Sequence, residues 1–232
     1  MRNTTSARFW FYSKRFIGKS FIKNLNIICK GCKMKIFKQT EIEELANIIN
    51  NDGVLAIPTD TVYGLCAKMN SKKARDNLMR VKNRPLDRAL PIMCADFEQI
   101  KSIAIVDEKE EKIIKAFMPG PITILLEKKN VIPQYVNNGL KSIAIRMATS
   151  NVIEELIRKV GCPIFMSSAN LSGEPVCESI EEIKNKFPNI DGIIEGQVSY
   201  GKASTIVDCT SEEIKIIREG PISLEEILSV IE

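Results

Sequence analysis

Segments with helical periodicity alternate with short apolar runs along most of this chain, and this alternation restricts the fold more than any single motif. Between residues 71 and 82, for example, Ala74, Leu78 and Val81 recur at the spacing of one helix face. Short apolar runs bounded by Gly or Pro, which are typical of strands, separate such segments. The interleaving predicts an α/β or α+β fold, in which helices pack on a sheet.

Capping residues and apolar runs give the expected boundaries of these elements. Helices are expected at residues 40–51, 71–82, 107–118 and 150–160, and two short helices are expected after Ser179 and Ser223. Strands are expected in the run that ends at Pro58 and at residues 90–94, 122–126, 142–146, 163–166, 205–207 and 214–217. Side chains three residues apart predict four capping boxes: Thr40 with Glu43, Asp107 with Glu110, Ser179 with Glu182, and Ser223 with Glu226.

The length and composition fit one main domain. At 232 residues the chain has room for one large domain or two small ones. Hydrophobic residues make up 44% and charged residues 27%, as in soluble globular proteins. No apolar run reaches the roughly 20 residues that a membrane helix needs. The simplest division is an extension at residues 1–33 and one domain at residues 34–232.

The extension differs from the rest of the chain in its charge. Ten basic residues precede the first acidic residue, Glu41, and 23 basic and 29 acidic residues remain beyond those ten. The main body is therefore mildly acidic, and its bulk charge does not require a nucleic-acid partner. Residues 1–33 are expected to be a disordered or accessory segment, either an organelle presequence or the product of a start assigned upstream of Met34. We expect a cytoplasmic protein, with an organellar location as the alternative.

The histidine and cysteine content excludes several kinds of site. The chain has no histidine, which rules out Ser-His-Asp and Cys-His catalysis. Its seven cysteines suggest no disulfide framework and fit a reducing compartment. Cys29 and Cys32 form a single C-x-x-C pair without further ligands, so a zinc site is not expected there.

A turn rich in hydroxyl groups follows the first buried run. Pro58 ends that run because it fixes φ and has no N–H to donate. The residues after it include Thr59, Asp60 and Thr61, and the segment closes on Gly64. Small donors and acceptors on a rigid turn suit a polar small molecule. An ordinary solvated turn is the alternative reading.

Three further polar features stand near the ends of expected strands. Residues 82–88 hold Lys82, Arg84 and Arg88, which can bind phosphate oxygens or form a solvated basic loop. Residues 167–173 place hydroxyl and amide groups after an apolar run, where α/β sheets bind ligands, although Asx and Ser capping explains such a turn equally well. Arg146 ends another apolar run and can bind a carboxylate or protect a sheet edge. Neither of the common glycine-rich nucleotide motifs is present.

Seven motifs together resemble the YrdC-like domain of threonylcarbamoyl-AMP synthases, from about Met34 to the end of the sequence. They occur in the family's order: Pro58-Thr59-Asp60-Thr61-Val62-Tyr63-Gly64-Leu65, Lys82-x-Arg84-Pro85, Pro119-Gly120-Pro121-Ile122-Thr123, Ile145-Arg146-Met147, Ser168-Ala169-Asn170-x-Ser172-Gly173, Ser204-Thr205-Ile206-Val207-Asp208 and Arg218-Glu219-Gly220. The resemblance implies a twisted, largely open sheet with flanking helices around a concave basic cavity.

The resemblance also implies an activity and the residues that perform it. The family is a group of nucleotidyltransferases that form L-threonylcarbamoyladenylate and pyrophosphate from L-threonine, bicarbonate and ATP, for the t6A modification of tRNA. Mg²⁺ with ATP is the expected cofactor, and proteins of the t6A pathway are expected to act downstream. By resemblance, threonine is held by Thr61, Arg146, Met166 and Ser204, whereas Thr59 and Asp60 are expected mainly to shape the turn. ATP is held by Lys82, Arg84, Arg88, Ser142, Ser168, Asn170, Val176 and Arg218, with Lys82 and Arg84 as the catalytic residues.

Two departures and one alternative accompany this resemblance. Met93 stands where family members often carry a polar residue, so one threonine contact is expected to differ. Twelve residues follow Gly220, which predicts a short form without the additional C-terminal domain of longer members. The alternative function is a non-catalytic module that binds double-stranded RNA, whose affinity would fall steeply with salt.

Overall fold

One mixed sheet organises the part of the chain that the computed structural model describes, residues 34–198 and 202–231. The sheet has ten strands in the spatial order β1 (Lys35–Phe37), β8 (Gly192–Ile194), β2 (Leu55–Pro58), β3 (Tyr63–Lys68), β7 (Ile164–Ser168), β4 (Ile92–Cys94), β6 (Ser142–Met147), β5 (Ile122–Glu127), β9 (Thr205–Asp208) and β10 (Lys215–Arg218). The order starts at β1 and ends at β10, so the sheet is open rather than a barrel. This agrees with the largely open α/β sheet that the resemblance implies.

Strands that are distant in the sequence are neighbours in this sheet. The hairpin of β2 and β3 is antiparallel and pairs on its outer sides with β8 and β7. Further along the sheet β4 runs parallel to β6, β6 runs antiparallel to β5, and β5 runs parallel to β9. The polar segments that precede or follow these strands are thereby brought together, although 145 residues separate Thr59 from Ser204 in the chain.

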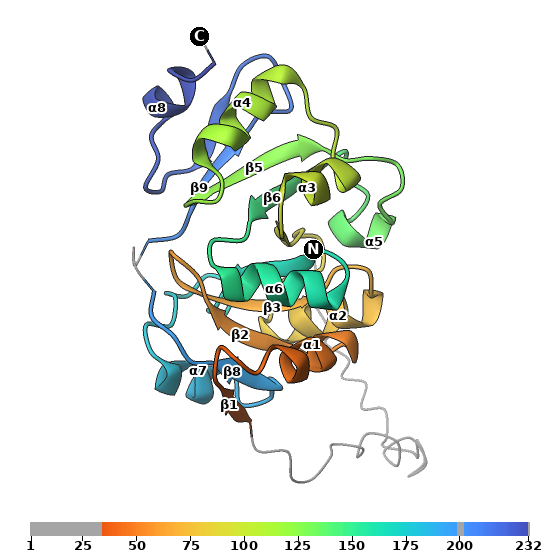
Figure 1. Cartoon of the computed structure of the whole chain (residues 1–232), viewed down its shortest axis with the longest axis vertical. Helices are drawn as coiled ribbons and strands as arrows, with labels where there is room; N and C mark the ends of the chain where they lie inside the picture. The colour runs from red at the N-terminus through yellow and green to blue at the C-terminus, as the bar shows by residue number, and fades with distance from the viewer. Residues whose placement is uncertain (1–33, 199–201, 232) are drawn as a thin grey trace, which may run out of the picture. The chain divides into compact units, whose positions relative to one another are not determined.

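The described residues also form eight helices, which cover both faces of the sheet (Figure 1). They are α1 (Ile42–Asn50), α2 (Lys72–Val81), α3 (Phe97–Ile103), α4 (Glu108–Phe117), α5 (Gln134–Asn137), α6 (Asn151–Val160), α7 (Ile180–Lys186) and α8 (Leu224–Leu228). Helices α1 and α6 lie side by side on one face and contact each other. Apolar residues of α2, α3, α4, α7 and α8 belong to the core on the other face.

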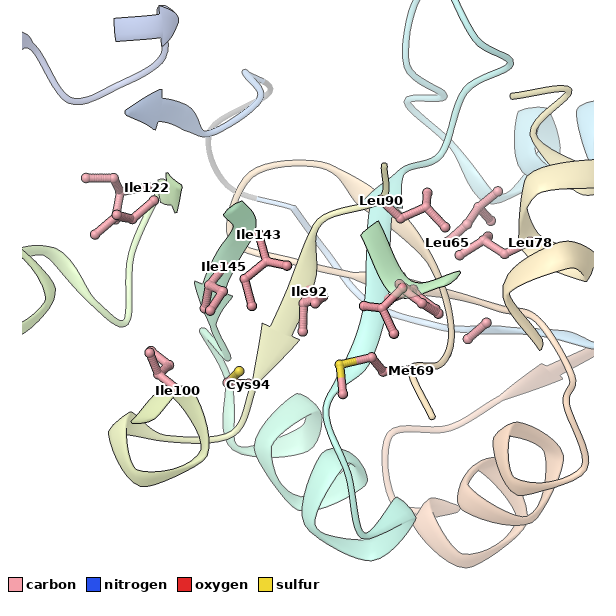
Figure 2. Close-up of a cluster of buried hydrophobic side chains, with 14 of the residues drawn as sticks. Leu65, Met69, Leu78, Leu90, Ile92, Cys94, Ile100, Ile122, Ile143 and Ile145 are labelled. Atoms are coloured by element: carbon pink, nitrogen blue, oxygen red, sulfur yellow. The ribbon is translucent and has the colours of Figure 1, made fainter. Parts of the chain in front are cut away.

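The alternation of side chains along the strands divides the interior into two apolar cores. In β4, Ile92 and Cys94 belong to the larger core and Met93 to the smaller one. The larger core contains residues of the sheet from β2 to β9, and Figure 2 shows part of it, including Ile122 and Ile145. Burial of each large aliphatic side chain in such a core contributes about 1.5–3 kcal/mol to folding.

The smaller core, under α1 and α6, covers only part of its face. It contains Leu55, Met93 and Met166 from β2, β4 and β7, but none of the described residues of β5 or β9. On β5, Thr123 alternates with Ile122 and Ile124, which face the larger core. A cavity opens where this second layer of helices ends, and Thr123 lines it.

Most predicted elements are confirmed, within one or two residues at their ends. Ser71, Asp107, Ser150 and Ser223 accept the capping hydrogen bonds of α2, α4, α6 and α8, and the capping boxes of α4 and α8 are complete. Ser179 also caps α7, but the carboxylate of Glu182 accepts from the N–H of Glu178, one residue earlier than predicted.

The predicted capping box at Thr40 and Glu43 is wrong. Helix α1 begins at Ile42, its N-cap is Glu41, and no side chain caps it. The carboxylate of Glu41 instead accepts from the N–H of Lys38 at 2.7 Å, which closes the preceding turn and moves the helix start beyond Thr40.

Five elements were not predicted: β1, β3, β8, α3 and α5. Strand β3 was missed for two reasons. A polar turn precedes it, and Gly64 and Lys68 interrupt the apolar pattern of Tyr63–Lys68. Strands β1 and β8 have three residues each and are formed by pairing with each other. No helix of the described residues is long and apolar enough to cross a membrane. The predictions for residues 1–33, including the C-x-x-C pair, lie outside the described residues.

Candidate functional site

A cavity of about 170 Å³ lies on the sheet face that α1 and α6 leave open. It is lined by Thr59, Thr61, Val62, Gly64, Arg84, Pro91, Ile92, Met93, Thr123, Arg146, Met166, Ser167, Ser168, Ala203, Ser204, Ile206 and Arg218. Of these described lining residues, the charged ones are three arginines and none is acidic. An anionic ligand is therefore the kind of molecule that the cavity favours.

The turn between β2 and β3 forms one wall of the cavity. The hydroxyl of Thr59 donates to the carbonyl of Val62 at 2.7 Å and accepts from the N–H groups of Thr61 and Val62. Thr59 therefore shapes the turn, as the sequence predicts. The residue at position 64 is glycine because a Cβ there would lie 2.4 Å from the sulfur of Met166 on the neighbouring strand.

The hydroxyl of Thr61 keeps one acceptor position for a ligand. It lies 2.9 Å from the hydroxyl of Thr59, whose own proton is used on Val62, so Thr61 accepts nothing from Thr59. Arg146 donates to the Thr61 oxygen at 3.0 Å. A hydroxyl oxygen has two acceptor positions, so one remains. Thr61 is therefore prepared for an N–H or O–H donor.

Arg146 spans the centre of the cavity wall. Its guanidinium donates from Nε to the carbonyl of Gly120 at 3.1 Å, from Nη1 to Thr61, and from Nη2 to the carboxylate of Asp60. Burial lowers the pKa of Arg146, and the nearby charge of Asp60 opposes that effect. Among the described residues these three contacts use three of the five N–H groups, so two remain for a ligand.

Two sequence-based interpretations change at this point. Arg146 does not protect a sheet edge, because β6 lies between β4 and β5. Asp60 was expected mainly to shape its turn, but it is the counter-ion of Arg146.

Ser204 and Arg218 form the far wall with Thr123. The hydroxyls of Thr123 and Ser204 lie 2.8 Å apart, and both residues are almost completely buried. Arg218, on β10, donates to the carbonyl of Ser204 at 2.8 Å and to its hydroxyl at 3.1 Å. Gly220 allows the end of β10 to approach β9 closely. Any side chain at this position would place its Cβ 2.2 Å from the nitrogen of Thr205.

Lys82 lies behind the cavity wall rather than in it. Its Nζ donates to the carbonyls of Ser168 and Asn170, and the side chain is 1% exposed. Burial lowers its pKa to about 7, with a smaller contribution from the charge of Arg84. The Ser168 hydroxyl donates to the Asn170 amide oxygen at 2.5 Å. Lys82 and Asn170 therefore hold the turn that presents Ser168.

The loop after α2 holds Arg84 at the cavity. Arg84 donates to the carbonyls of Arg88 at 3.1 Å and Ala89 at 2.6 Å, which folds the loop on itself. Arg75, buried on α2, donates to the carbonyl of Leu86 at 3.2 Å and so anchors the same loop. Burial, and to a lesser degree the charge of Arg88, lowers the pKa of Arg84.

The structure brings together about half of the predicted site residues. Those that line the cavity are Thr61, Arg84, Arg146, Met166, Ser168, Ser204 and Arg218. Lys82 and Asn170 support it from behind. Among the described residues, Arg88, Ser142 and Val176 stand apart from the lining: Arg88 is exposed, Ser142 begins β6 at the strand end away from Arg146, and Val176 follows the Ser168 turn. Their roles stay predictions.

Thr123 lines the cavity as well, although the sequence assigned it no role beyond its place at the end of the Pro119–Thr123 motif. It stands between two isoleucines on β5, so strand alternation places it on the face opposite the larger core. That signal is weak, because threonine is common in strands. Met93 is fully buried and lines the cavity beside Arg146, with which it is in register.

Comparison with known proteins places this architecture in a family. Residues 47–220 match the family model Sua5_yciO_yrdC, described as "Telomere recombination". The threonylcarbamoyl-AMP synthase of Pyrococcus abyssi is 36% identical over 197 residues, which are 84% of this chain and 58% of that protein. A putative threonylcarbamoyl-AMP synthase of Methanocaldococcus jannaschii is 34% identical over 208 residues, which are 85% of this chain and 98% of that protein.

Solved structures agree with the sequence comparison. The crystal structure of P. abyssi Sua5 complexed with L-threonine matches with a TM-score of 0.80 and 34% identity, covering 85% of this chain and 61% of that one. The chain thus spans less than two thirds of the P. abyssi protein. The family match covers well over half of the chain, from α1 to the turn after β10, and the chain belongs to the Sua5/YciO/YrdC family.

Proposed function

We propose that this chain is an L-threonylcarbamoyladenylate synthase, which forms threonylcarbamoyl-AMP and pyrophosphate from L-threonine, bicarbonate and ATP. The observation that carries the proposal is the joint lining of one cavity by an amino-acid side, with Thr61 and Arg146, and an anion side, with Arg84, Ser168 and Arg218. Relatives named threonylcarbamoyl-AMP synthase, at 34–36% identity, support it. The product would serve the t6A modification of tRNA.

The amino-acid side fits an α-amino acid. The two N–H groups that remain on Arg146 suit a carboxylate, which guanidinium binds in a bidentate manner. The acceptor position that remains on Thr61 suits an amine N–H. A related crystal structure, that of P. abyssi Sua5, contains L-threonine. The contacts with Arg146 and Thr61 would hold the carboxylate and the amine of threonine in one orientation.

The anion side fits the phosphates of ATP. Arg84 and Arg218 each use only part of their guanidinium on backbone carbonyls, so N–H groups remain that can bind phosphate oxygens. Because none of the described lining residues is a carboxylate, we expect Mg²⁺ to enter bound to the phosphates, as MgATP. Lys82 acts as a positioning residue for the turn that carries Ser168.

The chemistry requires positioning and charge neutralisation rather than a protein nucleophile. The threonine amine adds to CO₂ and releases a proton, or adds to bicarbonate and releases water; both routes give a carbamate. A carbamate oxygen then attacks the α-phosphorus, the bond to the bridging oxygen breaks, and pyrophosphate leaves. Arginines fixed by backbone carbonyls offset the charge that develops without reorganising, which is how a preorganised site lowers a barrier. A chain without histidine can perform both steps.

Product analysis tests the proposal directly. The full chain is mixed with MgATP, L-threonine and bicarbonate, and the products are separated and weighed by mass spectrometry. We expect threonylcarbamoyl-AMP and pyrophosphate, and neither when threonine or bicarbonate is omitted. Pyrophosphate release that persists without threonine would contradict the proposal.

Arg84→Ala tests the anion side. We expect the variant to lose at least about tenfold in kcat/KM for ATP, since each lost charge-assisted contact costs about 1.5–3 kcal/mol. Arg80→Ala is the matched control, because Arg80 is exposed on the same helix–loop segment, does not line the cavity and donates a side-chain hydrogen bond to Asn77. Equal rates for the two variants would remove Arg84 from the site.

A further inference from the structure

A buried arginine on α2 connects two segments that lie outside the cavity lining. Arg75 is 6% exposed and is not among the described residues that line the cavity. Its Nη2 donates to the carbonyl of Leu86 at 3.2 Å and to the side-chain oxygen of Asn138. Asn138 ends α5, and α5 contacts α2 (Figure 1). One nitrogen thus joins the loop after α2 to the turn after α5.

The bond from Arg75 to Leu86 fixes the exposed loop on which the position of Arg84 depends. The Arg84 guanidinium donates to the carbonyl of Arg88 at 3.1 Å, so it moves with that part of the loop. Among the hydrogen bonds of the described residues, the one that ties positions 85–88 to an element outside the loop comes from Arg75. The side chain that faces the cavity is therefore held in place from α2, through the loop backbone.

On the other side of Arg75, two asparagines continue the connection to β6. Asn138 has a φ of 60° and, through its side-chain oxygen, accepts from Arg75. Its neighbour Asn137 is 1% exposed, and its amide donates to the carbonyl of Ser142 at 2.8 Å. Ser142 begins β6 and is expected by resemblance to bind ATP. The segments of Arg84 and Ser142, two expected ATP ligands, are thus linked through Arg75.

We propose that Arg75 is a positioning residue for ATP, because it fixes the loop of Arg84 relative to the start of β6 before ATP binds. This inference rests on the proposed function and adds to it a residue outside the cavity. A loop that is already ordered loses less conformational entropy when it binds a ligand, so the affinity rises without a further contact. Arg84 then meets the phosphates in the orientation that the loop carbonyls set.

A purely structural role explains Arg75 less well. Its ion-pair partner Asp76, at 3.1 Å, has a side chain that is 41% exposed and also pairs with Lys72 at 2.6 Å. The Nε of Arg75 is buried and has no hydrogen-bond partner in the part of the chain that the structure describes. A buried charge with incomplete partners adds little to stability, and an apolar side chain of similar volume often serves the fold equally well. We therefore expect Arg75 to matter more for binding than for folding.

Arg75→Met in the full chain tests the inference, because methionine fills much of the same space and cannot donate a hydrogen bond. We expect the KM for ATP to rise roughly threefold to tenfold, the effect of one lost hydrogen bond, while the KM for L-threonine and the urea midpoint of unfolding stay near their wild-type values. Amide exchange followed by NMR gives a readout without catalysis. The N–H of Arg88, which donates to the carbonyl of Pro85 at 3.1 Å within the loop, should exchange faster in the variant. Lys72→Met, which removes an exposed cation from the same helix, is the matched control and should behave as the wild type in all these measurements.

Each other outcome overturns either the role of Arg75 or the proposed function. An unchanged KM for ATP, or an unchanged exchange rate at Arg88, refutes the role of Arg75 and leaves the proposed function standing. Equal rises in both KM values, together with a loss of stability, indicate a structural role and also refute the inference. Absence of turnover that depends on threonine and bicarbonate in the wild type contradicts the proposed function itself. If Arg75→Met does not fold, Asn138→Gly carries the same test with a smaller expected rise in the KM for ATP, because glycine keeps the φ of 60° and removes the oxygen that orients the Arg75 guanidinium.

Discussion

At the scale of single residues, the cavity depends on how buried charges and hydroxyls are paired. The sequence identified Arg146 and Thr61, because both lie in motifs that the family shares. It did not identify the pairing of Arg146 with Asp60, because 86 residues separate the two and only the fold brings them together. The same holds for Thr123 and Ser204. A motif therefore predicts which residue types meet a ligand, and the sheet topology decides how they meet each other.

The ion pair of Asp60 and Arg146 can be tested by a double-mutant cycle. Asp60→Asn leaves a buried arginine without its counter-ion, and we expect a loss of about 1–3 kcal/mol in the free energy of unfolding. In the Arg146→Met background the same substitution should cost close to nothing. Urea denaturation of the four proteins measures the coupling. Equal costs in both backgrounds would show that the pair contributes no stability.

Lys82 should give the protein a stability that rises with pH. Burial lowers its pKa to about 7, below the value of about 10.4 of a lysine in an unfolded chain. Between these values the unfolded state holds a proton that the folded state lacks, so the contribution of Lys82 to stability rises with pH across this window by up to about 1.4 kcal/mol per pH unit. The contribution is lowest below pH 7, where the buried ammonium is charged.

Unfolding of wild type and Lys82→Met between pH 6 and pH 9 checks this expectation. Lys82→Met removes the titrating group and keeps most of the side-chain volume. The difference in unfolding free energy between the two proteins should change in favour of the wild type as the pH rises. A difference that stays constant with pH would mean that Lys82 keeps an ordinary pKa in the fold.

At the scale of helices and strands, local chemistry explains what the sequence could predict. Serine and aspartate side chains cap α2, α4, α6, α7 and α8 as their types favour. Strands β1 and β8 were not predicted because their existence depends on partners elsewhere in the chain. Strand β8, with three residues, pairs on one side with β1 and on the other with β2, and no local pattern reports those partners.

Two cap substitutions distinguish the correct helix start from the predicted one. The Ser71 hydroxyl accepts from the N–H of Ala74 at 3.2 Å, so Ser71→Ala should lower the free energy of unfolding by about 1 kcal/mol. Thr40→Ala should change it by less than about 0.5 kcal/mol, because Thr40 lies outside α1. Thermal or urea unfolding of both variants measures the difference. A cost for Thr40→Ala as large as that for Ser71→Ala would restore the predicted capping box.

At the scale of the whole described region, the position of the cavity follows from where the layers of the fold end. The sequence predicted the interleaved elements and an open sheet, but not the order of ten strands. Helices α1 and α6 complete one core over part of the sheet, and the face of β6, β5 and β9 beyond it stays uncovered. No local sequence pattern shows where the layer of α1 and α6 ends on the sheet, because that position depends on the order of all the strands.

The thiols report on the integrity of both cores at once. Cys66, Cys94, Cys162, Cys177 and Cys209 are all buried. Burial raises the pKa of each, to about 12 for Cys66 and Cys209. Since the thiolate is the reactive form, we expect iodoacetamide to label these five positions slowly in the native protein and rapidly in denaturant. Peptide mapping of the labelled sites measures this, and fast native labelling at Cys66 or Cys209 would contradict the packing.

The parallel pairing of β5 with β9 also affects the order in which the site is made during synthesis. Thr123 leaves the ribosome 81 residues before Ser204, a delay of roughly 4–16 s at usual rates of translation. Thr61 and Arg146 precede Ser204 as well, so a growing chain contains these parts of the cavity wall before it contains Ser204 and Arg218. The cavity is therefore complete only after β9 and β10 have been added to the sheet.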